Sequence, residues 1–459
     1  MGSICYDELH MNSRKSNPQQ RDAAQSFDKT VFSNGTRLVL VPMDGVNSVA
    51  TCVMVETGSR NETPEINGVS HFLEHMVFKG TKKYPTTEDV NFIERMGGLQ
   101  NAYTDVDITN YHNKVMANDW KEALELNKEF ALHPLLEEKH IDKERDVILE
   151  EMKRYNDENS LRVGEEFQML LYKGTPLGMR VIGEEKSLRN AHAKTLREYH
   201  DRMYTPERTV VVMAGGIKNQ ELRIKNQAEE WFGPSAGSGL NAVNLRPGLE
   251  GRAVQNVKDT QDKPESVVIT KKDAEQAHIT LGVRTFGRGS TERFAWSVFN
   301  ILFGVSFTSR LFKEIREKRG LCYTVRSGSD NWDDVGNWSI YAGVATEKVE
   351  EAIKAILFEI QKAKEKGISE EEIAVSKKRI LTMVSFKAED PEFMAEYYGQ
   401  QELRHLPILT IDEYFRKITA VTKKEIDTLI RKYCVQKCLN LAVVWNKSID
   451  NNLEKLLSI

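Results

Sequence analysis

The residues of this chain with the clearest chemical potential are two histidines and a glutamate in the segment HFLEH, residues 71–75. In a helix, His71 and His75 lie one turn apart on the same face, and Glu74 falls within an arc of about 100°. Two imidazoles at this spacing can bind zinc at about 2.1 Å each, with a carboxylate beside the open position. The segment therefore predicts part of a metal site. Two surface histidines on a polar helix are the structural alternative.

A metal site needs at least one more ligand, and a second predicted helix offers two candidates. Apolar residues recur every seven positions at Ile141, Ile148 and Tyr155, which is typical of a stripe that faces the core. Glu144 and Glu151 fall within that stripe. Because an inward carboxylate is costly unless it is paired or bound to metal, these glutamates favour a metal site. A salt bridge, or a bend that exposes this face, is the alternative.

The elements that must position these residues follow from hydrophobic patterning. In each half of the chain, strand-like segments come first and helices follow. The expected strands are 31–41 (two short strands), 48–56, 98–104, 109–115, 209–215, 278–284, 323–327 and 338–343. The expected helices are 67–78, 86–97, 120–132, 137–172 with a break near 156–164, 348–366, and one capped by Ser369 and Glu372, and 294–318 is expected to be mostly helical. The pattern predicts an α+β fold and suggests an ancient duplication.

A change of composition separates the two halves. Residues 233–251 are rich in Gly, Ser, Pro and Asn, as interdomain linkers are. We therefore predict a flexible N-terminus at 1–26, a metal-binding domain at 27–232, a linker at 233–262 and a second domain at 263–459.

Composition excludes several classes of protein. Lys and Arg total 64 against 68 Asp and Glu, so there is no net basic field to hold nucleic acid. No apolar run reaches the roughly 18–20 residues that span a bilayer. The first 26 residues lack the basic and apolar stretches of a secretory signal, and the five cysteines are too scattered for a disulfide framework. We expect a cytoplasmic protein without nucleic-acid or membrane partners; the mitochondrial matrix is the alternative.

Taken together, the motifs resemble one known family. GVSHFLEHMVFKGT, with Glu151 following 76 residues after His75, resembles the inverted zinc motif of the pitrilysin and insulinase metallopeptidases. The resemblance is closest to the β subunit of mitochondrial processing peptidase and its bacterial relatives. It extends through NAYTD (101–105), ERDVILEE (144–151), EQAHITLG (275–282) and SRLFKEIREKRGLCY (309–323).

The resemblance implies a zinc endopeptidase of two related domains, each a mainly antiparallel sheet flanked by helices. His71, His75 and Glu151 would be the zinc ligands, with one Zn²⁺ per chain. Glu74 would be the general base that takes a proton from the attacking water and delivers it to the leaving amine. Glu144 would orient a ligand or water.

The resemblance also assigns residues that bind the substrate. Asn101 and Ala102 would lie on an edge strand to which an extended or unfolded peptide adds as a further strand. Arg316 and Tyr323, from the second domain, would polarise the scissile carbonyl and hold the oxyanion.

Partners follow from the family's architecture, in which a closed chamber takes four such domains. This chain supplies two, so we expect a homodimer, and a heterodimer with a related subunit is the alternative. The main functional alternative is a catalytically silent scaffold, or a partner subunit of a peptidase or respiratory complex. Such subunits typically lose the zinc motif, which is complete here. A metal-binding regulator would need a DNA-binding motif or a basic patch, and neither is visible.

Overall fold

The computed structural model describes residues 27–234, 261–447 and 453–459. The predicted N-terminal segment, 1–26, and most of the predicted linker, 233–262, lie outside these ranges. The domain boundaries drawn through them stay predictions.

The first half of the chain builds a six-stranded sheet in the order β1-β2-β6-β3-β5-β4. Its strands are β1 (Asp28–Val31), β2 (Arg37–Pro42), β3 (Ser48–Val55), β4 (Leu99–Thr104), β5 (Thr109–Met116) and β6 (Thr209–Gly215). β2 and β6 run parallel, and the other neighbours are antiparallel. β6, TVVVMAG, is buried along its whole length, as its continuous apolar run predicts for a central strand. β4 lies at the edge.

The second half builds a five-stranded sheet in the order β7-β11-β8-β10-β9. Its strands are β7 (Glu265–Thr270), β8 (Gln276–Phe286), β9 (Cys322–Asn331), β10 (Val335–Ala345) and β11 (Asn440–Trp445). β7 and β11 are parallel and the rest antiparallel. Apart from β1, the two sheets share one topology. When the strands of each half are counted along the chain from β2 and from β7, they lie side by side in the order first, fifth, second, fourth, third. This confirms the predicted α+β fold of two related, mainly antiparallel domains. β7 and β11 were not predicted.

Helices flank both sheets. Those of the first half are α1 (Val69–Val77), α2 (Thr87–Val90), α3 (Phe92–Arg95), α4 (Trp120–Leu132), α5 (Glu138–Asp157), α6 (Asn159–Leu171), α7 (Glu185–Arg189), α8 (Ala193–Met203) and α9 (Glu221–Phe232). Those of the second are α10 (Glu292–Asn300), α11 (Val349–Lys366), α12 (Glu370–Lys387), α13 (Pro391–Leu403), α14 (Ile411–Ala420) and α15 (Lys423–Tyr433). The predicted break in the long helix falls at Glu158. The stretch 294–318, expected to be mostly helical, consists of α10 followed by wide-turn helical segments at Ile301–Val305 and Phe312–Lys318.

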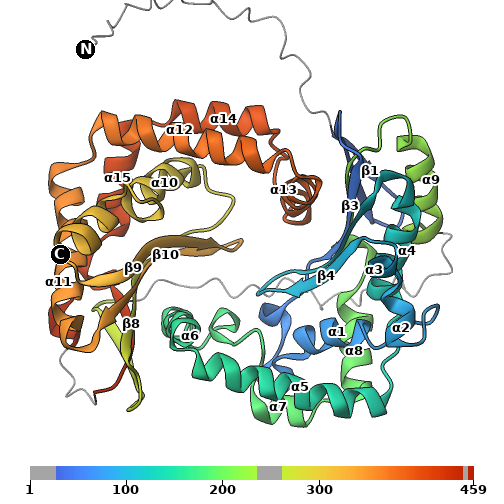
Figure 1. Cartoon of the computed structure of the whole chain (residues 1–459), viewed down its shortest axis with the longest axis horizontal. Coiled ribbons are helices and arrows are strands. Elements are labelled where there is room, and N and C mark those ends of the chain that lie inside the picture. The colour runs from blue at the N-terminus through green and yellow to red at the C-terminus, as the bar shows by residue number, and fades with distance from the viewer. Residues whose placement is uncertain (1–26, 235–260, 448–452) are drawn as a thin grey trace, which may run out of the picture.

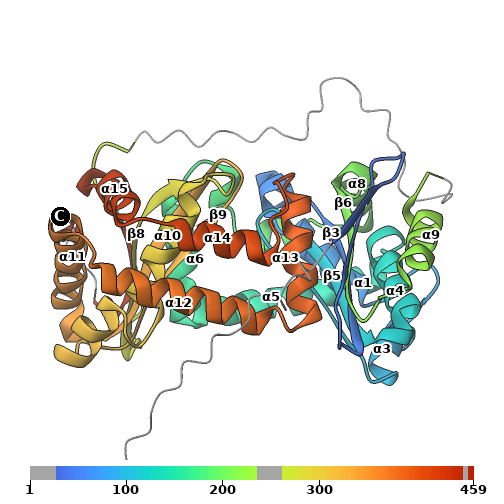
Figure 2. The ribbon, with the colours of Figure 1, turned by 90° about the horizontal axis from the view of Figure 1, so that it is seen from above.

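Each half contributes one helix to the core of the other (Figures 1 and 2). α6 packs on the second sheet, where Phe167 joins a buried cluster with Val444 of β11. α13 packs on the first sheet, where Met394 and Tyr398 are buried with Val212 of β6. Because of this exchange, each sheet packs against a helix from the other half of the chain, and each half contributes apolar side chains to the other's core.

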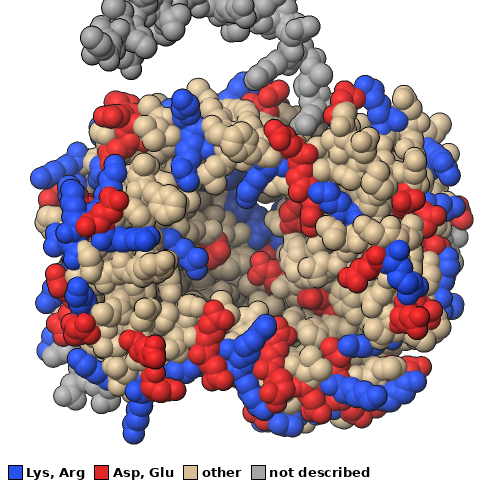
Figure 3. Space-filling view, in the orientation of Figure 1, with Lys and Arg blue, Asp and Glu red and all other residues tan. Residues whose placement is uncertain are grey.

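The molecular surface is hollowed between the two halves (Figure 3). On this face, positive and negative side chains are interspersed and form no field of one sign. Among the residues that the structure describes, no helix is long and apolar enough to cross a membrane.

Candidate metal centre

Helix α1 carries the HFLEH segment and divides it between two environments. Its apolar side chains, such as Phe72 and Met76, are fully buried in the core of the first half. His71, Glu74 and His75 lie half-buried on the rest of the helix surface. The helical spacing predicted from the sequence therefore places both imidazoles on one accessible face.

Helix α5 brings a carboxylate to these imidazoles. Glu151 Oε2 lies 3.5 Å from His75 Nε2 and 3.8 Å from His71 Nε2. Two zinc ligands at about 2.1 Å, separated by a tetrahedral angle, are about 3.4 Å apart, so Glu151 Oε2 lies at a suitable distance from either imidazole. Among the histidine, cysteine and acidic side chains of the described ranges, this is the group whose ligand atoms all lie within 4.8 Å of one another.

Glu144 lies two helical turns before Glu151 on α5 and contacts the other side of the His75 ring. Its Oε1 lies 2.9 Å from His75 Nδ1, and its Oε2 lies 2.7 Å from Lys79 Nζ. With Nδ1–H donating to Glu144, Nε2 points toward Glu151, which is the orientation a metal ligand needs once Nε2 has lost its proton. Sequence reasoning missed Lys79, although its position one helical turn after His75 was a usable signal.

The pKa values of the two histidines move in opposite directions. Burial, with His75 alongside, lowers the pKa of His71 to about 4. Burial also acts to lower the pKa of His75, but hydrogen bonds to Glu144 and Glu151 outweigh it and raise this pKa to about 9. The hydrogen bond with His75 lowers the pKa of Glu151, so this candidate ligand is ionised at neutral pH.

Glu74, the general base that the sequence predicts, lies on the same helix as both histidines. Burial raises the pKa of Glu74, and contacts with Thr104 and His75 partly oppose this. A carboxylate whose pKa is raised toward neutrality accepts and returns protons more effectively than an exposed one. Thr104 ends the edge strand β4, so Glu74 lies where that strand meets α1.

The edge strand β4 has an open side. It pairs with β5 alone, through Asn101 opposite His112 and Ala102 opposite Tyr111. The backbone N–H of Ala102 donates to the side chain of Asn101 at 2.9 Å. This N–H therefore has an acceptor on the neighbouring, exposed Asn101.

Comparison with known proteins identifies the family. The family model described as insulinase, peptidase family M16, matches residues 38–185, and the model described as the peptidase M16 inactive domain matches residues 190–380. The chain is similar to a Bacillus subtilis protein named as an uncharacterized zinc protease, at 33% identity over 87% of this chain and 93% of the relative. A similarly named protein of Mycobacterium bovis is 31% identical over 90% and 92%. The chain belongs to the insulinase family, peptidase family M16.

Solved structures support the same fold for this insulinase-family chain. A protease from Helicobacter pylori superposes with a TM-score of 0.83 at 22% identity, covering 92% of this chain and 99% of that one. A peptidase M16 inactive domain from Pseudomonas fluorescens gives 0.80 at 16% identity, covering 92% and 98%. At these identities the likeness is one of fold.

The second half of this M16 chain has no counterpart of the histidine pair. α10 follows the second strand of its sheet, as α1 does in the first, and it reads ERFAWSVFN. This helix contains no histidine and no cysteine. The candidate metal ligands therefore all lie in the first of the two related domains.

Arg316 and Tyr323 lie together in the second half. The Arg316 guanidinium stacks 4.9 Å from the centroid of the Tyr323 ring and 4.8 Å from that of Phe312. Tyr323, on the edge strand β9, is 76% exposed. Across the part of the chain that the structure describes, neither residue has a hydrogen bond or ion pair to His71, His75 or Glu151. The structure thus brings this pair together but leaves it apart from the metal-binding group.

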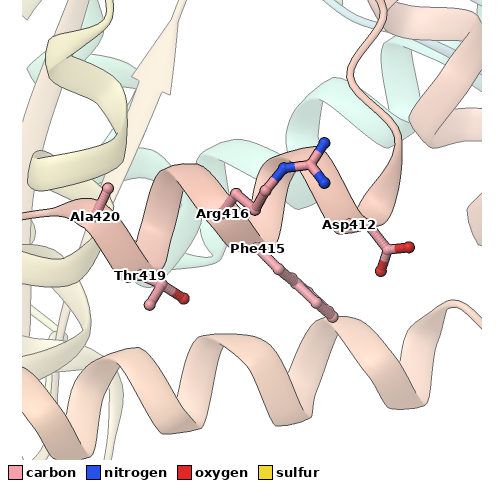
Figure 4. Close-up of a pocket in the computed structure, with 5 residues that line it drawn as sticks. All are labelled: Asp412, Phe415, Arg416, Thr419 and Ala420. Carbon is pink, nitrogen blue, oxygen red and sulfur yellow. The ribbon is translucent and has the colours of Figure 1, made fainter. Parts of the chain in front are cut away.

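A second hollow, on α14, lacks the residues for metal chemistry (Figure 4). It is an open groove of about 510 Å³, lined by Asp412, Phe415, Arg416, Thr419 and Ala420. Phe415 and Arg416 point to different sides of the helix. The candidate metal ligands of this M16 chain lie instead on α1 and α5, with Glu74 near β4.

Proposed function

We propose that this chain is a zinc-dependent endopeptidase that cleaves extended or unfolded peptides. The observation that carries the proposal is the convergence of His71, His75 and Glu151, with Glu151 Oε2 at 3.8 and 3.5 Å from the two imidazoles. Glu74 lies on the same helix as both histidines. The names of the Bacillus and Mycobacterium relatives, as zinc proteases, support the same class of reaction.

The chain's own residues would divide the reaction between them. When bound, zinc supplies a water of lowered pKa and polarises the peptide carbonyl. Glu74 takes the proton as water attacks, and passes it to the leaving amine. Glu144 keeps His75 in the orientation of a ligand. Arg316 and Tyr323 would stabilise the oxyanion, a contribution typically worth on the order of 10²- to 10³-fold in rate.

The open edge of β4 suits a peptide that binds as a strand. A substrate carbonyl could replace the Asn101 side chain as the acceptor for the Ala102 N–H. Main-chain hydrogen bonds of this kind are indifferent to side-chain identity. This supports a preference for extended conformation over a particular sequence.

We further propose that the chain works as a homodimer, because it carries both the metal-binding residues and the Arg316–Tyr323 pair in separate halves. Mixing Glu74→Gln chains with Tyr323→Phe chains tests which subunit each set serves. Restored cleavage in the mixture means that the pair acts on the partner's zinc, and no rescue means that it acts within one chain. A monomer at micromolar concentration that cleaves peptides normally would contradict the dimer.

The proposed activity is tested with a mixed library of unstructured peptides, analysed by mass spectrometry. Cleavage is expected from the zinc-loaded protein, lost after treatment with a chelator, and restored when zinc is returned. Zinc-loaded protein that cleaves no peptide would instead indicate the silent scaffold.

A further inference from the structure

The helix that carries both histidines begins without a cap of its own. The first N–H groups of any helix lack intrahelical partners. The N-cap of α1 is Gly68, in the left-handed region at φ 96°, and it has no side chain to accept them. The first turn also contains no acidic residue. Partners for these groups must therefore come from elsewhere in the chain.

Glu62 supplies these partners from the preceding loop. Its Oε2 accepts hydrogen bonds from the Gly68 N–H at 2.7 Å and from Asn67 Nδ2 at 2.9 Å. Its Oε1 accepts from the Ser70 N–H at 2.8 Å. Glu62 is only 5% exposed. A negative charge placed here also complements the positive end of the helix dipole.

Two further contacts hold the start of the same helix. Ser70 Oγ lies 2.8 Å from the Tyr199 hydroxyl, which lies 2.9 Å from Thr57 Oγ1. Just before the helix, Gly183 approaches so closely that a Cβ at that position would lie 2.5 Å from the Asn67 carbonyl oxygen. The first turn of α1 is consequently fixed both along and around the helix axis.

Stability alone is a poor explanation for Glu62. The carboxylate forms no ion pair within the described residues, and burial raises the pKa of Glu62 despite its hydrogen bonds. What the carboxylate provides is direction, because its two oxygens bind the N–H groups of two different residues, Gly68 at the N-cap and Ser70 in the first turn.

We propose that Glu62 is a positioning residue for the metal centre, which sets the rotation of α1 so that His71 and His75 face Glu151. The inference rests on the proposed zinc function. Ser70, which Glu62 binds, directly precedes His71, whereas Glu151 lies on a different helix. A rotation of α1 therefore moves both imidazoles relative to Glu151, and metal geometry tolerates only about 0.2 Å.

The test compares zinc affinity and cobalt spectra in wild type and Glu62→Gln. Glutamine keeps the size but has one acceptor oxygen, so its amide group must face a backbone N–H. We expect zinc to bind about 10- to 100-fold more weakly, the usual loss for a residue that supports metal ligands. The visible absorption of the Co²⁺-substituted protein should also change, since it reports ligand geometry.

Thr422→Ala is the matched control. Thr422 caps α15, in the second half, by accepting a hydrogen bond from the Glu425 N–H. Its loss should lower the melting temperature of the metal-free protein and leave zinc affinity and the cobalt spectrum unchanged. Loss of a helix cap is thereby separated from loss of metal geometry.

Unchanged zinc affinity and cobalt spectrum in Glu62→Gln would overturn the inference, whatever its melting temperature. If that variant does not fold, Glu62→Asp replaces it, since it keeps the charge but draws the carboxylate back by one methylene. Weaker zinc binding by Glu62→Asp supports the inference and unchanged binding overturns it. Wild-type protein that binds no zinc would contradict the proposed function itself, which distinguishes the two failures.

Discussion

At the scale of residues, the two inward glutamates of α5 have different tasks. Both Glu144 and Glu151 were predicted from one hydrophobic stripe, and both do approach the histidines. Their division of work could not be read from spacing, because they occupy equivalent positions of the stripe seven residues apart. The crossing of α5 over α1 decides it: Glu151 meets the Nε2 atoms and Glu144 meets Nδ1 of His75.

Removal of Glu144 should weaken the metal centre without removing a ligand. In Glu144→Ala, His75 loses the acceptor at Nδ1 and Lys79 loses its ion-pair partner. We expect zinc affinity to fall about 10- to 100-fold, as measured by competition with a chelator. Glu166→Ala is the control, since Glu166 is a buried glutamate paired with Arg162 on α6. Equal zinc affinities in the two variants would refute this role for Glu144.

At the scale of elements, the sequence predicted features whose interacting residues are neighbours in the chain. It did not predict features that depend on residues far apart in the chain. The capping box predicted for α12 is present: Ser369 Oγ accepts from the Glu372 N–H at 3.2 Å, and Glu372 Oε2 accepts from the Ser369 N–H at 2.9 Å. All its partners lie within four residues, so the sequence contains the whole motif.

Helix α13 shows the opposite case and was not predicted. It contains Gly399, which disfavours a helix interior. A Cβ at that position would lie 2.7 Å from Met54 Sδ and 2.8 Å from a methyl of Val212, so close packing on the first sheet requires the glycine. The side chains that require a glycine here belong to residues about 190 or more positions earlier in the chain. The local sequence pattern therefore cannot predict this contact.

The α12 cap also predicts a pH dependence of stability. Burial alone would raise the pKa of Glu372, but hydrogen bonds from Arg310 and Ser369 outweigh it and lower the pKa to about 2. A carboxyl with a lowered folded-state pKa stabilises the fold above its unfolded pKa of about 4.5 and loses this contribution as the pH falls toward about 2.

Glu372→Gln should therefore destabilise the protein by about 1–2 kcal/mol at pH 7, after allowance for solvent screening. The difference in free energy of unfolding between wild type and variant should shrink as the pH falls below about 5. Urea unfolding across this range provides the measurement. A difference that stays constant between pH 7 and pH 4 would argue against the ionised Glu372–Arg310 pair.

At the scale of the whole molecule, a buried ion cluster joins the two halves. Asp107, in the turn between β4 and β5, binds Arg404 Nη2 at 2.5 Å and Arg288 Nη2 at 2.6 Å. The Arg404 Nη1 also donates to the Asp107 backbone carbonyl. Both arginines belong to the second half. The sequence predicted two related domains but not this contact or the exchange of α6 and α13, because each depends on how the domains pack.

Asp107→Asn should destabilise the whole chain by about 3–5 kcal/mol, because the buried Arg404 loses its countercharge and Arg288 keeps only Asp333. Calorimetry should show a lower melting temperature and a broader transition, as the halves unfold less cooperatively. Asp44→Asn is the control, since Asp44 pairs with Lys218 on the surface and such pairs contribute little. Equal melting temperatures for the two variants would exclude Asp107 as the link between the halves.

The most direct test of the zinc peptidase is a paired measurement on wild type and Glu74→Gln: zinc per chain by metal analysis, and turnover of an unstructured peptide. We predict about one zinc per chain in both proteins, with cleavage abolished in Glu74→Gln, because His71, His75 and Glu151 hold the metal while Glu74 moves the proton. Zinc-loaded Glu74→Gln that cleaves as fast as wild type, or wild type that binds no zinc, would contradict the proposed zinc peptidase.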